Sequence, residues 1–167
     1  SVAIGMGDAS SIPAIIESVA PTTNDSETEN VALDASITLL VAALDTADAR
    51  SLSKLTFSAD FCNWVQASHA TAAKIVASSD AAASQIQLAL AILGRRRGSV
   101  TEQLLGGATE NAPVKITEDE VAVGVASLIS ARHSTEIQQA AVMALSRTGR
   151  PQVADLLVTR FPSASAG

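Results

Sequence analysis

The sequence predicts an all-α fold built as an α-solenoid, a superhelix of stacked antiparallel helix pairs. Hydrophobic residues make up 47% of the 167-residue chain and aromatic residues only 2%, so Ala, Leu, Ile and Val must fill the core. These side chains suit helices that approach closely, and Ala has the highest intrinsic helix propensity. The strand-like alternation of β-branched residues is almost missing from the sequence. Residues 136–157 show two short amphipathic patterns that meet at Thr148-Gly149-Arg150-Pro151, as in one unit of a helical repeat.

Short polar residues mark where helices begin, because the first four N–H groups of a helix need acceptors from outside it. Four capping boxes precede apolar periodic runs: Ser26-x-x-Glu29, Ser99-x-x-Glu102, Thr117-x-x-Glu120 and Thr135-x-x-Gln138. With these starts we predict about nine helices, over residues 11–19, 29–44, 47–55, 60–77, 81–95, 100–105, 118–131, 136–147 and 152–161. Two polar connections, 21–28 and 106–115, are interpreted as surface loops of a single domain that spans residues 1–167.

Similar segments within the chain support the prediction of a helical repeat. Residues 86–95 match residues 137–147, with one residue of slippage near the end. The helices that follow share a Gly, an aliphatic residue and an aliphatic doublet: Gly7, Ile12 and Ile15-Ile16; Gly98, Val100 and Leu104-Leu105; Gly149, Val153 and Leu156-Leu157. One helix pair cannot bury its apolar face alone, so stacked pairs would share a continuous core, with Ala140, Ala141 and Ala144 allowing close packing. The unit at Gly7 lacks its first helix, and we therefore expect a fragment of a longer chain.

These patterns carry a resemblance to a known family. The segment Gly7-Asp8-Ala9-Ser10-Ser11-Ile12-Pro13-Ala14-Ile15-Ile16-Glu17-Ser18-Val19 resembles the second half of a HEAT-type repeat of the PBS-lyase-HEAT-like kind. In such repeats a Gly-Asp turn leads to an apolar-Pro-x-aliphatic-aliphatic helix. Residues 136–157 are similar to a complete repeat, and they depart from the pattern at Arg150, where Asp is usual. The resemblance covers about a third of the chain and implies a fold far more than a function.

A narrower resemblance concerns the runs 138–147 and 153–163. They resemble the helical-repeat segment of large planctomycete-type, haem c-containing membrane-bound dehydrogenases. The resemblance implies a sugar-dehydrogenase-like propeller before the repeats and a haem c Cys-x-x-Cys-His motif after them. Neither module is in this sequence, whose single cysteine is Cys62. The chain would then be a spacer between redox modules, located in the cell envelope or periplasm.

Charge and composition narrow the classes of partner. The chain has 11 basic and 17 acidic residues, and residues 1–60 hold nine of the acids but only Arg50 and Lys54 as bases. This acidic first part repels phosphate backbones, so nucleic acid is not an expected partner. The sequence has no run of 18 apolar residues, so no membrane insertion is predicted. A lone Cys62 excludes an internal disulfide and a cysteine-based metal cage. No cofactor or metal is predicted, and a small-molecule ligand is not expected.

The run Arg95-Arg96-Arg97 before Gly98 is the strongest local charge feature. Three guanidinium groups could contact an anion or an acidic partner. They also fall at a predicted helix end, where cations complement the helix dipole, so a solvated helix end is the favoured interpretation.

Four other groups of residues are candidates for a site, and the sequence favours a functional role for none of them. Cys62 and His69 are seven residues apart on one predicted helix, but no orienting acid accompanies them, so Cys62 is interpreted as a core residue. His133 is placed at a helix corner. Phe57, Phe61 and Trp64 are predicted to form a core cluster where helices 47–55 and 60–77 meet. Gly106-Gly107 lacks the motif of a phosphate-binding loop.

The sequence therefore predicts a non-catalytic scaffold or protein-interaction module that presents helix faces to another protein or to flanking domains. An enzyme is the alternative, because HEAT-type repeats also occur in bilin lyases and DNA glycosylases. Both enzymes would need a groove with aromatic residues and with acids or bases. The absence of Tyr and the acidic first part argue against each. A third possibility is a purely architectural spacer that has no partner.

Overall fold

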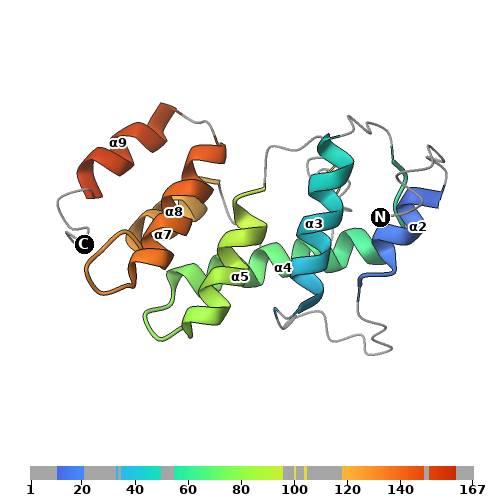
Figure 1. Ribbon diagram of the computed structural model, residues 1–167, viewed down its shortest axis with the longest axis horizontal. Helices are drawn as coiled ribbons and strands as arrows, with labels where there is room; N and C mark the ends of the chain where they lie inside the picture. Colours follow the sequence, from blue (N-terminus) through green and yellow to red (C-terminus); the bar gives the residue numbers. More distant parts are fainter. Residues whose placement is uncertain are drawn as a thin grey trace. The chain divides into compact units, whose positions relative to one another are not determined.

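The computed structural model describes residues 11–20, 33, 35–49, 55–95, 100, 104, 118–148 and 151–160. All regular secondary structure in these residues is helical, which confirms the all-α prediction for the described part of the chain. The bounded helices are α2 (Ile12–Glu17), α3 (Ala35–Ala49), α4 (Ala59–Ala77), α5 (Ala83–Leu93), α7 (Glu118–Ser127), α8 (Thr135–Thr148) and α9 (Pro151–Arg160), drawn in Figure 1. Of the predicted helix 100–105, Val100 and Leu104 are described; both are helical and fully buried.

The chain divides into two compact units. Unit 1 comprises residues 1–68 and 97–113, and unit 2 comprises residues 69–96 and 114–167. The division falls inside α4, between Ser68 and His69. Each unit has buried aliphatic side chains of its own.

Unit 1 is organised around α3. Its apolar residues Ile37, Leu40, Leu44 and Ala47 are at most 2% exposed and recur at helical spacing, which defines one buried face. Helix α2 packs against α3 and buries its own Ile12 and Ile16. Full burial of one such side chain contributes about 1.5–3 kcal/mol to folding.

The prediction of two helices over residues 29–44 and 47–55 is wrong, because α3 continues without a break from Ala35 to Ala49. Asp45 is exposed, and the Thr46 hydroxyl donates a hydrogen bond of 2.8 Å to the carbonyl of Ala42 in the preceding turn. These polar side chains are therefore accommodated on the helix surface. Leu44 and Ala47 on either side of them are buried, so the apolar face is continuous.

Hydrogen bonds connect the helices of unit 1, two of them between residues that are far apart in the sequence. The Ser58 hydroxyl accepts the N–H of Phe61 at 3.3 Å and so caps the start of α4. The carboxylate of Glu17 on α2 accepts the backbone N–H of Ser58. In a capping box a Glu three residues into the same helix makes this second contact, whereas here another helix supplies it. Asp48 of α3 likewise accepts the N–H of Val100 at 3.2 Å.

Unit 2 is centred on α8, which packs against α5, α7 and α9, while α7 also packs against α9 (Figure 1). The core of this unit includes Ile86, Leu90, Ile92, Val125, Leu128, Ile137, Ala141, Leu145 and Val153. The predicted helices 136–147 and 152–161 agree with the observed α8 and α9 to within one residue at each bound. Between them, Gly149 and Arg150 lie outside the described residues.

The end of α5 lies tightly against α8 at two small residues. A Cβ atom built on Gly94, the residue that ends α5, would lie 3.1 Å from the Cα of Ala144 and 3.2 Å from its Cβ. Ala141 on α8 is fully buried and Ala144 is 6% exposed, as predicted for close packing, whereas Ala140 is half-buried. The tight contact at Ala144 therefore depends on the missing side chain of Gly94.

The ends of α7 and α8 differ from the prediction. Helix α7 ends at Ser127 and not at Ala131, because Leu128 and Ile129 donate their N–H groups three residues back, to Val125 and Ala126, in a tightened last turn. Leu128 and Ile129 are nevertheless buried, which is why the apolar periodicity extends past the helix.

At the start of α8, Ser134 takes the capping position that was predicted for Thr135. Its hydroxyl accepts the N–H of Ile137 at 3.5 Å, and its carbonyl accepts the N–H of Gln138 at 3.0 Å. The other three predicted capping boxes begin at Ser26, Ser99 and Thr117, outside the described residues. The glycines Gly7 and Gly98 of the repeat pattern also lie outside them.

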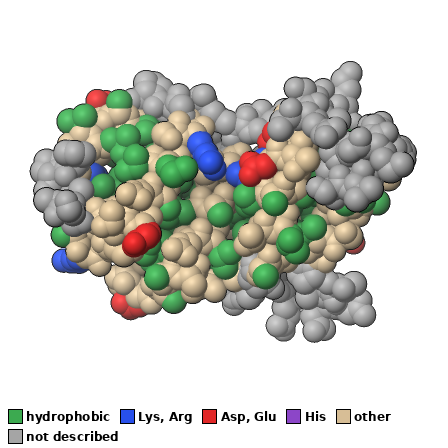
Figure 2. Space-filling model, in the orientation of Figure 1, with side chains coloured by type: hydrophobic (Ala, Val, Ile, Leu, Met, Phe, Trp, Pro, Cys, Tyr) green, Lys and Arg blue, Asp and Glu red, His purple; other side chains and the backbone are tan. Residues whose placement is uncertain are grey.

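Large hydrophobic side chains also reach the surface. In the described residues these are Leu39, Val123, Val142, Met143 and Val158, with exposed fractions from 38% to 74%. Hydrophobic atoms are visible on the face drawn in Figure 2. Four of the five belong to α7, α8 and α9 of unit 2.

Candidate functional site

Of the predicted anion or partner contacts, the structure describes only Arg95, because Arg96 and Arg97 lie outside the described residues. Arg95 follows the C-terminal end of α5 and is 8% exposed, so the interpretation as a solvated helix end is wrong for this residue. Burial removes water from the guanidinium, and with the nearby charge of Arg147 it lowers the pKa of Arg95 to about 10. Arg95 remains a cation at neutral pH.

Arg147 is the second cation at this end of unit 2, and sequence reasoning did not place it there. It is an exposed residue in the last turn of α8, close enough to Arg95 for their charges to interact. The signal was present in the internal match, because Arg95 and Arg147 end the two similar segments. Helices α5 and α8 therefore lie with their C-terminal ends together, and the equivalent arginines are near enough for their charges to interact.

Cys62 has surroundings that disfavour a nucleophile. The thiol is half-buried, and its pKa is raised, first by burial and then by the negative charge of Glu17 on α2. A raised pKa keeps the thiol protonated at neutral pH, whereas nucleophilic cysteines are thiolates. His69 lies in the same helix and is half-buried. The described residues contain no group of three or more His, Cys, Asp and Glu side chains that could hold a metal ion.

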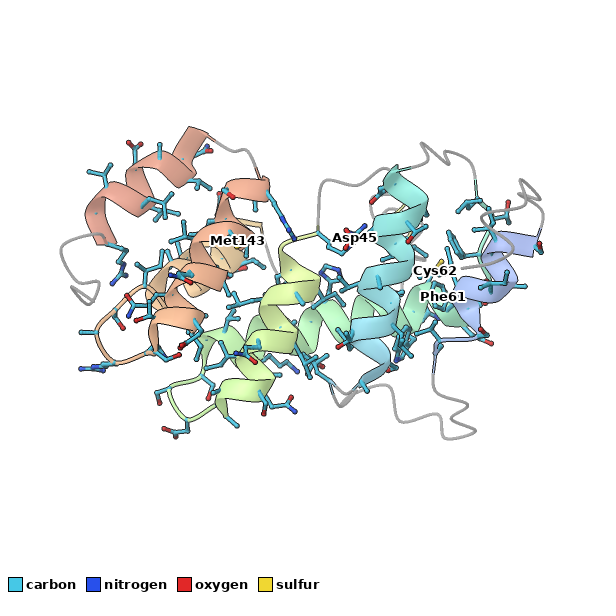
Figure 3. The ribbon with its side chains drawn as sticks, in the orientation of Figure 1. Asp45, Phe61, Cys62 and Met143 are labelled. Carbon is cyan, nitrogen blue, oxygen red and sulfur yellow. The ribbon has the colours of Figure 1, made fainter. Side chains whose placement is uncertain are left out.

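The predicted aromatic cluster forms at the start of α4, near the labelled residues Phe61 and Cys62 in Figure 3. The rings of Phe57 and Phe61 stack at a centroid distance of 5.4 Å, and those of Phe61 and Trp64 are tilted at 5.7 Å. Phe61 is 3% exposed, which confirms a core position. Of the predicted helix 47–55, residues 47–49 belong to α3, and residues 50–54 lie outside the described residues.

His133 lies at the corner between α7 and α8, as predicted. Its backbone N–H donates to the carbonyl of Ser130, and its own carbonyl accepts the side-chain amide of Gln138 at 2.9 Å. Gln138 is 6% exposed, so this contact satisfies a buried polar group and fixes the chain as it enters α8.

A groove between α7 and α9 is a surface feature that sequence reasoning missed. It has a volume of about 450 Å³, within the range of roughly 300–1,000 Å³ that is typical of ligand pockets. Helix α7 lines it with Asp119, Ala122 and Val123, and α9 lines it with Gln152, Val153, Asp155, Leu156, Thr159 and Arg160. We call it the α7–α9 groove.

The α7–α9 groove has an apolar base and a polar rim. Ala122 and Val153 are 7% and 6% exposed, whereas Val123 is 51% exposed and leaves apolar surface open to solvent. Asp119 and Asp155 at the rim are exposed, and Arg160 is half-buried. The signal in the sequence is the run 121–126, which is apolar all round and therefore has more apolar surface than one core face can bury.

No helix in the described part of the chain combines the length and the hydropathy that a membrane span requires.

Comparison of the chain with protein-family models, with curated proteins and with solved structures finds no match. The HEAT-type resemblance therefore stays a prediction from the residue patterns.

Proposed function

We propose that this chain is a non-catalytic scaffold of HEAT-type helical repeats that holds another protein, or a flanking domain, on the outer faces of its helices. The observation that carries the proposal is the exposure of two neighbouring hydrophobic side chains on α8, Val142 at 38% and Met143 at 55%. Helix α8 packs against α5, α7 and α9, yet these two side chains remain exposed. Exposed apolar surface on a packed element is typical of a contact site for another protein.

The packing of α5 on α8 supports a repeat architecture. These two helices carry the matching segments 86–95 and 137–147, and their C-terminal ends lie together at Gly94 and Ala144. In a stack of related helix pairs, equivalent helices of successive units contact each other in this way. A solenoid built like this offers extended surfaces for binding, and its repeats need no catalytic group.

The proposal is tested by affinity capture from lysate of the source cells, using the whole chain and a variant with Val142→Lys and Met143→Lys. The wild type is expected to retain at least one protein that the variant loses, because two buried lysines would oppose an apolar contact. The matched control adds two lysines to exposed positions of the same unit, Ala77→Lys and Gln87→Lys. It should retain the same protein as the wild type.

Circular dichroism must show that all three proteins have the same helix content. Retention of the same proteins by all three would contradict a binding role for this face of α8. Retention of no specific protein by the wild type would favour the purely architectural spacer. A defined enzymatic turnover by the wild-type chain would contradict the non-catalytic assignment.

A further inference from the structure

The α7–α9 groove has the length and the lining of a helix-binding groove. Its α9 side runs from Gln152 to Arg160, which at a rise of about 1.5 Å per residue corresponds to about 12 Å, or roughly two helical turns. Its α7 side contributes residues at spacings of three and four, as one face of a helix does. An amphipathic helix that enters such a groove contacts it with residues at positions i, i+3, i+4 and i+7.

The walls of the groove favour a helical occupant over an extended one. Both walls are α-helices, whose backbone groups are hydrogen-bonded within the helix, so they offer no strand edge to pair with. An extended peptide would leave its own N–H and C=O groups without partners over the apolar residues Ala122, Val123 and Leu156. A helix satisfies these groups internally and presents only side chains.

The charges at the rim of the groove favour an occupant with basic side chains. Two carboxylates, Asp119 and Asp155, lie on opposite walls, and Arg160 is the single cation among the lining residues that the structure describes. Glu120, next to Asp119 on α7, is exposed and adds negative charge nearby. Basic side chains beside the apolar stripe of an incoming helix are therefore attracted, and acidic ones are repelled.

We propose that the α7–α9 groove binds an amphipathic α-helix of a partner protein, with aliphatic side chains in the groove and Lys or Arg side chains against Asp119 and Asp155. This inference rests on the proposed scaffold function and names a second contact surface for it, separate from Val142 and Met143. The apolar base supplies affinity by burial of Val123 and Leu156, and the two carboxylates supply selectivity for charge.

The test uses two fluorescein-labelled 18-residue peptides with identical leucine positions at the i, i+3, i+4 and i+7 spacing. One has Lys on both flanks of the leucine stripe, and its twin has Glu at the same positions. Fluorescence anisotropy is recorded as the whole chain is titrated into each peptide. The Lys peptide should bind, and the Glu peptide should bind about tenfold more weakly or not at all.

Variants of the whole chain locate the binding. Val123→Ser and the pair Asp119→Asn and Asp155→Asn should each weaken binding of the Lys peptide about three- to tenfold. The matched controls are Val158→Ser, an exposed valine on α9 outside the groove, and Asp80→Asn, an exposed acid at the turn before α5. Neither control should change the affinity by more than twofold.

Three outcomes would overturn the inference. Failure of the Lys peptide to bind would do so, as would equal losses in the control and groove variants, which would indicate attraction to the net negative charge alone. A third is dimerisation of the chain, seen by light scattering and lost in Val123→Ser, because a second copy would then fill the groove. Lysate capture that depends on Val142 and Met143 would leave the scaffold function standing in all three cases.

Discussion

A Cβ atom built on Gly94 would lie 3.1 Å from the Cα of Ala144, so the end of α5 lies tightly against α8 at these two residues. The same Cβ would lie 3.0 Å from the carbonyl oxygen of Leu90, so the backbone leaves no room on either side. Gly94 has φ of −69°, a conformation open to any residue. The glycine is thus needed for space and not for its backbone freedom.

Replacing Gly94 with Ala should therefore destabilise unit 2. In open space the change would gain about 0.4–1 kcal/mol by restricting the unfolded chain, but overpacking against backbone atoms typically costs about 1–3 kcal/mol. We expect a net loss in the free energy of unfolding, measured by urea denaturation followed by circular dichroism. Gly124→Ala is the matched control, since its Cβ would meet only the side-chain tip of Val76 at 3.2 Å. A stability of Gly94→Ala equal to or above that of Gly124→Ala would contradict the close contact.

The position of the cap at α8 can be tested by two adjacent substitutions. Ser134→Ala removes the hydroxyl that accepts the N–H of Ile137, and loss of such a cap costs about 1 kcal/mol. Thr135→Ala should leave the free energy of unfolding almost unchanged, because Thr135 is the exposed first residue of the helix. If Thr135→Ala proved the more damaging change, the cap would be at Thr135, as the sequence pattern predicted.

The Ser134 hydroxyl also affects the pKa of Glu136. A hydrogen bond from this hydroxyl is the largest cause that lowers the pKa. The pKa of a carboxyl is lowered when the bond favours its charged form, so this contact stabilises the fold above the unfolded pKa and is lost as the pH falls through the folded one. In Ser134→Ala, an NMR titration should find the pKa of Glu136 closer to its ordinary value. An unchanged pKa would show that Ser134 does not donate this bond.

Cys62 offers a direct probe of unit 1, because it is the only thiol in the chain. Glu17→Gln keeps an oxygen acceptor for the N–H of Ser58 but removes the charge that helps to raise the pKa of the Cys62 thiol. The pKa should fall and yet stay above its ordinary value, since burial is the larger cause. The pH dependence of alkylation by iodoacetamide measures this shift, with Asp80→Asn as the control. An unaltered or upward-shifted profile in Glu17→Gln would place Glu17 away from Cys62.

Removing the like charge beside Arg95 should stabilise the protein. Arg147→Gln is expected to raise the free energy of unfolding by a few tenths of a kcal/mol, because the charge of the exposed Arg147 is well screened by solvent. The gain should shrink at high salt, because screening weakens the repulsion that it relieves. Arg132→Gln, at an exposed turn position in the same unit, serves as the control. A loss of stability in Arg147→Gln alone would indicate that Arg147 makes a favourable contact that outweighs the repulsion.

The fold could be predicted where the local sequence signals agree with the tertiary packing. The pair α8 and α9 was predicted almost to the residue, because amphipathic periodicity and the Gly-Arg-Pro corner agree there. At Asp45 and Thr46, two residues that disfavour helices suggested a break, but the buried Leu44 and Ala47 keep the helix continuous. Tertiary burial overrides local propensity at such points.

The candidate site was less predictable than the fold. The burial of Arg95 and its proximity to Arg147 result from the packing of α5 on α8, which no short motif encodes. The α7–α9 groove similarly needs two helices that are 30 or so residues apart in the sequence. Only the all-round apolar run 121–126 hinted at an extra contact surface.

The most direct test of the scaffold proposal is photo-crosslinking in the source cells, with a photoreactive amino acid in place of Met143. The account predicts a discrete crosslinked protein at Met143, a residue 55% exposed on α8, and none when the same amino acid replaces Ala77 at the exposed end of α4. Crosslinks that are equally abundant at both positions, or absent from both, would contradict the proposal that the outer face of α8 holds a partner.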